Sequence, residues 1–221
     1  MMDNVQGQRR PLKVRQKQWA GGIARWLGQR GVTPNQISLA SIAFALAGAA
    51  AFLISGNLEG GWRWWPLLLA ATMIQGRLLC NLFDGMVAVE GGKSTPAGEL
   101  FNEVPDRVSD TLLLVALGYS LPGFESAIWL GWLAALLAVL TAYVRVLGSA
   151  LGVLADFRGP MAKQHRMALL TTACVLSVFD SLWAEPGMAL WLALVLVAAG
   201  SAATCGRRLA GIHAQLNREE G

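Results

Sequence analysis

Carboxylate and amide side chains gather in one short stretch of the chain, NLFDGMVAVEGGKSTPAGELFNEVPDRVSD, between segments that are otherwise apolar. The polar residues that stand out in it are Asn81, Asp84, Asn102, Asp106 and Asp110. An ionisable side chain is costly inside a bilayer, so such residues usually face a cavity or a partner. These oxygen atoms are therefore candidates for holding a ligand.

The spacing of these residues places them on two helix faces. Asn81 and Asp84 are three residues apart, so they share a face that Gly85 and Ala88 extend with little bulk. A second face carries residues at intervals of four, which are Gly98, Asn102, Asp106 and Asp110. The linker over residues 90–97 is short, so we expect two antiparallel helices whose polar faces meet.

The chemistry of the two faces suits a hard cation. Oxygen ligands near the ends of two helices fit Mg²⁺ or Mn²⁺, which commonly keeps substrate phosphates among its ligands. The small residues leave room for a phosphate-bearing substrate near the backbone. The alternative is that these side chains only tie helices together by hydrogen bonds, as polar residues do in membranes. That alternative explains one or two polar residues more readily than five at matched spacing.

The segments around these faces indicate an all-α integral membrane protein. The chain has 221 residues, of which 54% are hydrophobic and 14% charged, whereas about 25% are charged in a typical soluble domain. A membrane span needs about 20 mostly apolar residues. The six predicted transmembrane helices cover residues 35–54, 64–89, 98–121, 126–151, 167–183 and 189–205.

The distribution of Lys and Arg predicts the orientation. Residues 1–33 carry seven of them. The loops between the first and second, third and fourth, and fifth and sixth predicted spans carry only one, Arg63. Further cations lie at 93, 158, 163, 166, 207, 208 and 218. By the positive-inside rule, both termini are expected in the cytoplasm, in a multi-pass protein of the inner (cytoplasmic) cell membrane. Because the cations lie at segment ends, the net charge of +4 gives no reason to expect nucleic acid.

The N-terminal segment is expected to lie on the membrane. Residues 14–27 mix tryptophans with cations, which is typical of an amphipathic helix at the interface, although a disordered basic tail is the alternative. Thr33 suits a helix N-cap, with Pro34 at the first helical position. We divide the chain into a cytoplasmic or interfacial segment, a six-helix transmembrane domain and a cytoplasmic tail, over residues 1–33, 34–206 and 207–221.

The polar stretch resembles the signature of the CDP-alcohol phosphatidyltransferase family, D-x-x-D-G-x-x-A-R, eight residues, then G-x-x-x-D-x-x-x-D. In this chain the pattern is filled by Asn81, Asp84, Gly85, Ala88 and Val89, then after eight residues by Gly98, Asn102 and Asp106. VTPNQIS, at 32–38, also looks like the family's entry to its first span. The resemblance therefore covers nearly the whole chain.

The resemblance implies a reaction and roles for the matching residues. A substituted phosphate, usually phosphatidyl from CDP-diacylglycerol, would pass from the CDP-alcohol to a second alcohol with release of CMP, in phospholipid biosynthesis. Asp84 would ligate Mg²⁺ or Mn²⁺, and Asp106 would be the base for the acceptor hydroxyl and a further ligand. Gly85, Ala88 and Gly98 would leave room for the nucleotide. A homodimer in contact with membrane lipids is also expected from the family.

The chain departs from the family pattern at three positions. Asn81 and Asn102 stand where the family has metal-binding aspartates, and Val89 replaces its arginine. Two lost negative charges should weaken metal binding, although an amide oxygen can still ligate. Glu103 and Asp110 are nearby acids that could compensate. We therefore expect one metal where relatives hold two, or a different geometry.

A second polar group lies at the cytoplasmic ends of the fourth and fifth predicted spans. The family generally uses basic residues here for phosphate groups, so we interpret Arg145, Lys163 and Arg166 as substrate contacts. Ordinary positive-inside anchoring is the alternative. The group favours a phosphorylated acceptor. Arg107 is expected to neutralise a neighbouring carboxylate, and Arg77 to pair with an acid of the site or bind phosphate.

Two rival functions remain open at this point. The departures at 81, 89 and 102 fit a family member that has lost catalysis and binds a lipid or CDP-alcohol, or acts as a membrane scaffold. A small transporter would spread its polar residues across the membrane depth, whereas here they gather at one side. The enzyme is the favoured interpretation. The acceptor alcohol, for which glycerol phosphate, inositol, its phosphate and serine all qualify, is left undetermined.

Overall fold

Long helices make up the part of the chain that the computed structural model describes, which is residues 18–58, 60–90, 97–153, 159–182 and 184–219. The helices are α1 (Gln18–Gln29), α2 (Pro34–Asn57), α3 (Trp64–Glu90), α4 (Gly98–Tyr119), α5 (Ala127–Ala150), α6 (Lys163–Ser177) and α7 (Met188–Glu219). Two short 3-10 turns, η2 (Gly60–Arg63) and η3 (Asp180–Leu182), lie between them. The described residues contain no strand, as the all-α prediction requires.

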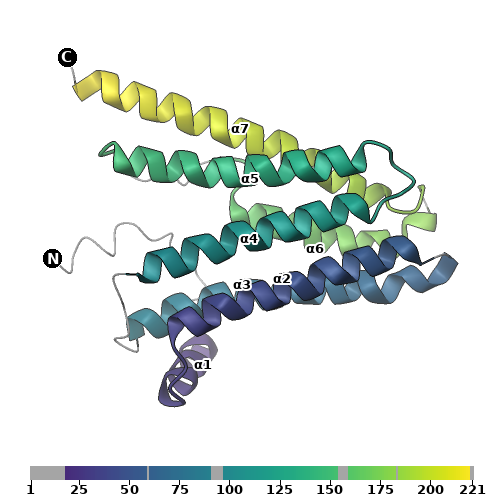
Figure 1. The fold of residues 1–221 in the computed structure, drawn as a ribbon, viewed down its shortest axis with the longest axis horizontal. Coiled ribbons are helices and arrows are strands. Elements are labelled where there is room, and N and C mark those ends of the chain that lie inside the picture. The colour runs from purple at the N-terminus through teal and green to yellow at the C-terminus, as the bar shows by residue number, and fades with distance from the viewer. Residues whose placement is uncertain (1–17, 59, 91–96, 154–158, 183, 220–221) are drawn as a thin grey trace.

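The long helices lie side by side along one axis, and successive helices run in opposite directions (Figure 1). α2 packs against both α3 and α4, α5 packs against α4 and α7, and α6 packs against α3 and α7. α1 projects from one end of the bundle, which we call the α1 end. The last turns of α3 and α5 and the first turns of α4 and α6 all lie at this end, so the predicted polar groups converge there.

Four of the described helices, α2, α3, α5 and α7, are long and apolar enough to cross a membrane. α4 does not qualify because five of its 22 residues are charged, and α6 does not because it has only 15 residues. A 15-residue helix is about 22 Å long, which is shorter than the hydrocarbon core. The membrane character is confirmed, while the count of six spans stays a prediction.

The helix ends fall close to the predicted positions except in the last two spans. For the predicted span 167–183, the helix begins earlier, at Lys163, and ends at Ser177. For the predicted span 189–205, α7 continues without a break to Glu219. The sequence after 205 contains no proline, and Ile212 is buried against Val144 and Val153, so packing carries the helix onward. The boundary drawn at 206 therefore lies inside one helix.

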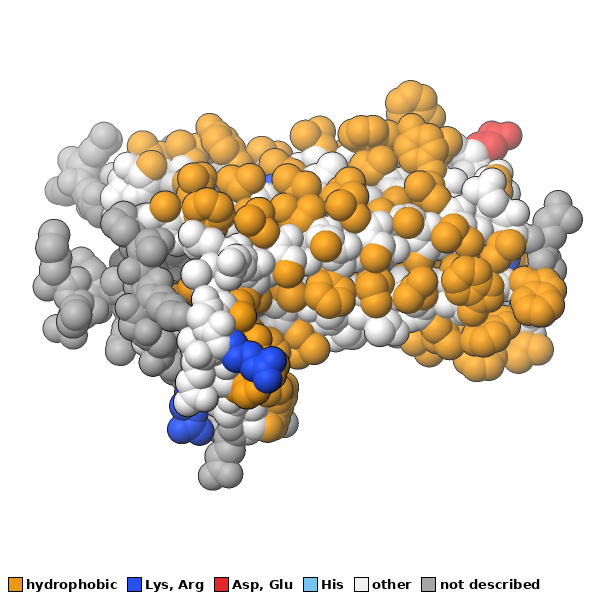
Figure 2. Space-filling model, turned by 60° about the horizontal axis from the view of Figure 1, so that its bottom comes forward, with side chains coloured by type: hydrophobic (Ala, Val, Ile, Leu, Met, Phe, Trp, Pro, Cys, Tyr) orange, Lys and Arg blue, Asp and Glu red, His pale blue; other side chains and the backbone are white. Residues whose placement is uncertain are grey.

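α1 is amphipathic, as the N-terminal segment was predicted to be. Ala20 and Ala24 are buried against α3, while Trp19 and Trp26 are exposed. The guanidinium of Arg30 lies 4.2 Å from the centre of the Trp26 ring. Figure 2 shows Lys and Arg gathered mainly over this projecting helix, whereas hydrophobic side chains cover most of the bundle face beside it. This arrangement fits a helix lying at a membrane interface.

The start of α2 confirms the predicted cap. The Gln36 backbone N–H donates to Thr33 Oγ1, and the Thr33 backbone N–H donates to Gln36 Oε1, which together form a capping box. Pro34 follows the cap, as expected. Residues 1–17, with Lys93 and Arg158, lie outside the described residues, so the predicted beginning of the interfacial helix and those cations are not placed.

Two glycines draw α4 and α5 into close contact. A Cβ added to Gly118 would lie 2.7 Å from the carbonyl oxygen of Ala127, and one added to Gly131 would lie 2.8 Å from that of Leu114. Larger side chains would push the helices apart. Small residues at such contacts are typical of packing between helices in membranes. The contact fixes α4, which carries the acids, beside α5, which carries Arg145.

Candidate functional site

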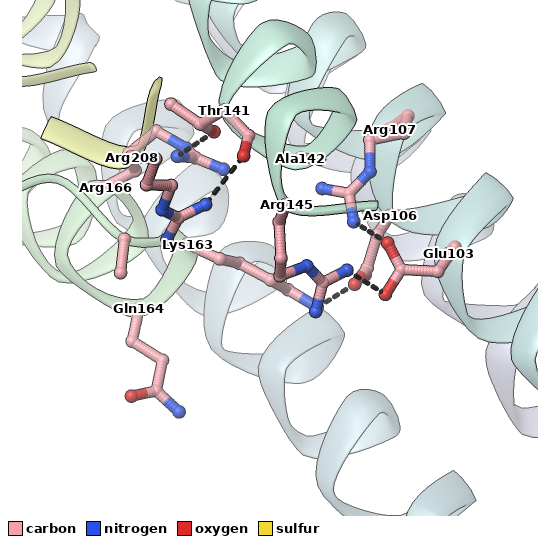
Figure 3. Close-up of a pocket in the computed structure, with 11 residues that line it drawn as sticks. Glu103, Asp106, Arg107, Thr141, Ala142, Arg145, Lys163, Gln164, Arg166 and Arg208 are labelled. Atoms are coloured by element: carbon pink, nitrogen blue, oxygen red, sulfur yellow. Dashed lines mark hydrogen bonds and ion pairs between the residues drawn. The ribbon is translucent and has the colours of Figure 1, made fainter. Parts of the chain in front are cut away.

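A cavity of about 170 Å³ opens at the α1 end between α4, α5, α6 and α7 (Figure 3). Its lining consists of Glu103, Asp106, Arg107, Thr141, Ala142, Arg145, Ala162, Lys163, Gln164, Arg166 and Arg208. Five of these residues are cationic and two are acidic. Positive charge in a concave site favours anions, and guanidinium groups match phosphate oxygens in a bidentate way. The cavity is therefore suited to a phosphate-bearing molecule.

Asp106 lies where three helices meet at the edge of this cavity. Its residue is only 5% exposed. Asn81 Nδ2, from α3, donates to Asp106 Oδ1 at 3.0 Å, and Arg77 Nη2 lies 3.4 Å from the same oxygen. Lys163, at the start of α6, donates to Oδ2. The contact between Asn81 and Asp106 confirms that the polar faces of α3 and α4 meet, as their spacing predicts.

Asp84 is buried beside α2 and does not line the cavity. Ser38 Oγ donates to Asp84 Oδ2 at 2.6 Å, and the Gly85 backbone N–H donates to Oδ1. Its carboxylate is close enough to Asp106 and Lys163 for their charges to interact. Asn102, by contrast, is exposed.

A buried ion network connects α3, α4 and α6 behind Asp106. Arg77 Nη2 lies 2.6 Å from Asp110 Oδ1, and Arg166 Nη2 lies 2.7 Å from Asp110 Oδ2. All three residues are at most 1% exposed. Arg166 also donates to the carbonyl oxygen of Met161, at 3.0 Å. The pairing of Arg77 with an acid of the site is thus present, as predicted. Arg166, predicted as a substrate contact, lines the cavity and forms an ion pair with Asp110.

The partly exposed mouth of the cavity holds a second ion cluster. Glu103 pairs with Arg107, one turn along α4, and with Arg145 of α5, whose Nη2 lies 2.5 Å from Glu103 Oε1. Figure 3 shows both arginines directed at the Glu103 carboxylate. The expectation that Arg107 neutralises a neighbouring carboxylate is confirmed. Arg145 and Lys163, both predicted substrate contacts, line the cavity as well.

Three polar residues of the site were not singled out from the sequence. Arg208 was interpreted only as a membrane-anchoring cation, yet it is 6% exposed and donates to the carbonyl oxygen of Thr141 at 2.6 Å. Thr141 lies in an apolar run, and Ser38 is only one of several small polar residues in α2. The predicted span ended at residue 205, so Arg208 was not assigned to a helix face. A prediction that α7 continues past 205 would have been needed to identify Arg208 as a site residue.

The small residues predicted to admit the nucleotide lie outside this cavity. Gly85 and Ala88 are half-buried on the last turns of α3, and Gly98 is half-buried at the first turn of α4. None of the three lines the cavity of Figure 3. Their proposed role toward the nucleotide stays a prediction.

The oxygen ligands present fit one divalent ion better than several. In the described part of the chain, no group of three or more His, Cys, Asp or Glu residues is placed to hold a metal. Glu103 and Asp110, the acids considered as compensation, both face arginines. The oxygen donors that remain for a metal ion are the carboxylates of Asp84 and Asp106 and the amide oxygens of Asn81 and Asn102. Mg²⁺ commonly binds one or two carboxylates together with substrate phosphates, so this set fits an ion completed by its substrate.

Comparison with known proteins places this arrangement among membrane-bound transferases. The family model described as CDP-alcohol phosphatidyltransferase matches residues 31–202. The inner membrane protein YnbA of Escherichia coli is 29% identical over 143 residues, which cover 64% of this chain and 66% of YnbA, slightly less than two thirds of that protein. The phosphatidylinositol phosphate synthase of Mycobacterium marinum is 27% identical, covering 85% of this chain and 76% of that protein. The archaetidylinositol phosphate synthase of Aeropyrum pernix is 27% identical, covering 72% and 74%.

Solved structures share the fold. The crystal structure of Mycobacterium tuberculosis phosphatidylinositol phosphate synthase with CDP-DAG bound has a TM-score of 0.72 at 23% identity, covering 87% of this chain and 92% of that one. The same synthase in complex with manganese and citrate has a TM-score of 0.73 at 23% identity, covering 87% and 88%. The helical arrangement described above is therefore a known one.

Proposed function

The chain belongs to the CDP-alcohol phosphatidyltransferase family, and on that basis we propose that it transfers the phosphatidyl group of CDP-diacylglycerol to a phosphorylated alcohol and releases CMP. Membership makes it a membrane transferase of phospholipid biosynthesis. The donor, the class of acceptor and the residue roles are the proposal. The names of two relatives, phosphatidylinositol phosphate synthase and archaetidylinositol phosphate synthase, support a phosphorylated headgroup.

The observation that carries the acceptor class is the basic cavity beside Asp106. Five cations surround about 170 Å³, and the two acids among the lining residues leave the cavity with a positive excess. A neutral polyol needs no such charge, whereas an acceptor phosphate would satisfy it through charge-assisted hydrogen bonds. Arg145, whose side chain is 22% exposed, can exchange the Glu103 carboxylate for an incoming phosphate. Lys163 is 24% exposed, and its ammonium has three N–H groups, so it can keep its bond to Asp106 and donate to the phosphate as well.

The proposed reaction uses Asp106 as the base. The acceptor phosphate would be held by the cavity cations, which brings a hydroxyl of the acceptor toward the Asp106 carboxylate at the cavity edge. Asp106 would take the hydroxyl proton as the oxygen forms a bond to the phosphorus of the phosphatidyl group. The bond from that phosphorus to the bridging oxygen of the pyrophosphate breaks, and CMP leaves with the bridging oxygen.

The family is divalent-metal-dependent, and manganese is present in a solved relative. In this chain Asp84 and Asp106, with the amide oxygens of Asn81 and Asn102, would hold Mg²⁺ or Mn²⁺. Such an ion, when bound, offsets the negative charge that develops on the departing CMP. The buried ion pairs with Asp110 engage Arg77 and Arg166, so neither arginine is expected to take over that task.

The proposed topology puts this chemistry at the cytoplasmic face of the inner membrane. The site lies at the α1 end, to which α7 returns with Arg207, Arg208 and Arg218. Among the described residues, Arg63 is the only Lys or Arg in the loops at the opposite end of the bundle. Six spans, cytoplasmic termini and a homodimer remain part of the proposal. Soluble acceptors and the lipid donor would meet at that face.

The acceptor class can be tested by CMP release from CDP-diacylglycerol with purified protein and Mg²⁺ or Mn²⁺. Acceptors are supplied in matched pairs, inositol against inositol phosphate and glycerol against glycerol phosphate, with serine as a further neutral case. We expect the phosphorylated member of one pair to react at least about tenfold faster, because each charge-assisted hydrogen bond contributes about 1.5–3 kcal/mol. Release with unphosphorylated acceptors alone would refute the acceptor class, and no release from folded protein would favour the non-catalytic lipid binder.

Arg145→Gln tests the contact of the cavity with the acceptor phosphate. We expect the KM for the phosphorylated acceptor to rise about tenfold while the KM for CDP-diacylglycerol stays near the wild-type value, since one guanidinium contact is lost. Arg207→Gln is the matched control, because Arg207 is exposed on α7 and does not line the cavity. An equal rise for an unphosphorylated acceptor would show that Arg145 acts only by holding Glu103 in place.

A further inference from the structure

The Asp106 carboxylate is already balanced by fixed positive charge. Arg77 is completely buried on α3, one turn before Asn81. It donates from Nη2 to the backbone oxygen of Asp106 at 3.2 Å, and the same nitrogen lies 3.4 Å from the carboxylate oxygen Oδ1. A guanidinium stays protonated in a protein, and a buried one requires anionic partners. Arg77 is thus a permanent positive charge against Asp106.

The other oxygen of Asp106 has a cation of its own. Lys163 donates to Oδ2 from the first turn of α6, on the cavity side, where its side chain is 24% exposed. Both oxygens of the carboxylate therefore face nitrogen donors from the protein. A carboxylate offers about four lone-pair sites, and three of them are occupied here.

The identity of residue 81 fits this arrangement. Asn81 Nδ2 lies 3.0 Å from Asp106 Oδ1. A carboxylate oxygen only accepts hydrogen bonds, so the amide must present its NH₂ group there. An aspartate at position 81 would place two carboxylate oxygens in contact, which requires a cation or a shared proton between them. Asparagine therefore fits an arrangement with no metal ion between the 81 and 106 side chains, and only its NH₂ group is used by Asp106, so the amide oxygen can still ligate an ion on the Asp84 side.

The charges around the site also balance without a second ion. Asp84, Asp106 and Asp110 supply three negative charges, and Arg77, Lys163 and Arg166 supply three positive charges. These cations contact Asp106 and Asp110, whereas Asp84 accepts hydrogen bonds from the Ser38 hydroxyl and the Gly85 backbone N–H. A first divalent ion would be offset by the pyrophosphate of the donor. A second would add uncompensated positive charge beside Lys163.

We propose that Arg77 and Lys163 act as the fixed counter-charges of Asp106, so that this chain binds a single divalent ion, on the Asp84 side of the site. The inference rests on the proposed function for the presence of a metal and of the CDP-alcohol donor. Side-chain cations then perform the charge balancing at Asp106 that a second metal ion would otherwise have to supply. Lys163 becomes a positioning residue that also sets how tightly metal is held.

The test counts Mn²⁺ bound to the full-length protein in detergent with CDP-diacylglycerol, by electron paramagnetic resonance of free and bound Mn²⁺. We expect one Mn²⁺ per wild-type chain and two per chain in Asn81→Asp/Asn102→Asp. Lys163→Met should bind Mn²⁺ about tenfold or more tightly, because a nearby positive charge is removed, while Lys163→Arg should resemble the wild type.

Two ions per wild-type chain would overturn the inference, as would CMP release that persists with no bound metal. An unchanged Mn²⁺ affinity in Lys163→Met would overturn it too, because Lys163 would then exert no charge effect on the metal. CMP release is measured on the same samples. One bound Mn²⁺ without any CMP release would leave the metal count standing and would count against the proposed reaction instead, so the two failures are distinguishable.

Discussion

Asp106→Asn is expected to lower kcat for CMP release by about 10²–10⁴-fold, the usual contribution of a general base. The amide has nearly the shape of the carboxylate but cannot accept the proton of the acceptor hydroxyl. It also turns an NH₂ group toward one of the donors that now face Asp106, either Asn81 and Arg77 or Lys163. The measurement is kcat with the best acceptor of the matched pairs, at saturating Mn²⁺.

A matched control separates catalysis from folding. Asp180 is 1% exposed, close to the 5% of Asp106, and accepts hydrogen bonds from Ser177 Oγ and the Gly187 backbone N–H at 2.8 Å. It lies between α6 and α7 at the end opposite to the site. The folded fraction of the Asp180→Asn variant should therefore have a kcat near the wild-type value. If Asp106→Asn kept a rate within about tenfold of the wild type, the base would have to be another group.

The local features of the site were predictable from the sequence because helical periodicity fixes them. Residues three or four apart share a helix face whatever the tertiary fold, so Asn81 with Asp84 and Asn102 with Asp106 could be grouped. The pair between Arg107 and Glu103 follows from the same rule. The antiparallel placement of α3 and α4 followed from the short linker between them.

The contacts between distant helices were not predictable in the same way. Ser38 meets Asp84 across 46 residues, and Arg208 meets Thr141 across 67. Such contacts depend on which helices pack together and on how far each helix is shifted along its neighbour. Close backbone contacts, such as that of Gly118 with Ala127, set this packing. The two oxygens of Asp106 facing Arg77 and Lys163 are a consequence of the same packing.

Asp110→Asn is expected to lower the free energy of unfolding by about 3–5 kcal/mol, the usual result of removing one partner from a buried ion pair. The neutral amide would leave Arg166 without its carboxylate and Arg77 with only the longer contact to Asp106. Neither guanidinium can lose its charge to relieve this. The change is measured by chemical denaturation of the detergent-solubilised protein, followed by tryptophan fluorescence.

Glu103→Gln is the control on the same helix, because Glu103 also faces two arginines but its side chain is 25% exposed. Water can hydrate Arg107 and Arg145 once the carboxylate is gone, so the expected loss is about 1 kcal/mol or less. The contrast isolates burial as the cause, since both variants replace a carboxylate by its amide between two guanidinium groups. Equal losses in the two variants would mean that water reaches Arg77 and Arg166 as freely as it reaches the cavity mouth. The network behind Asp106 would then be too hydrated to hold that carboxylate in one position, and the charge balance proposed for the metal site would have to come from Lys163 alone.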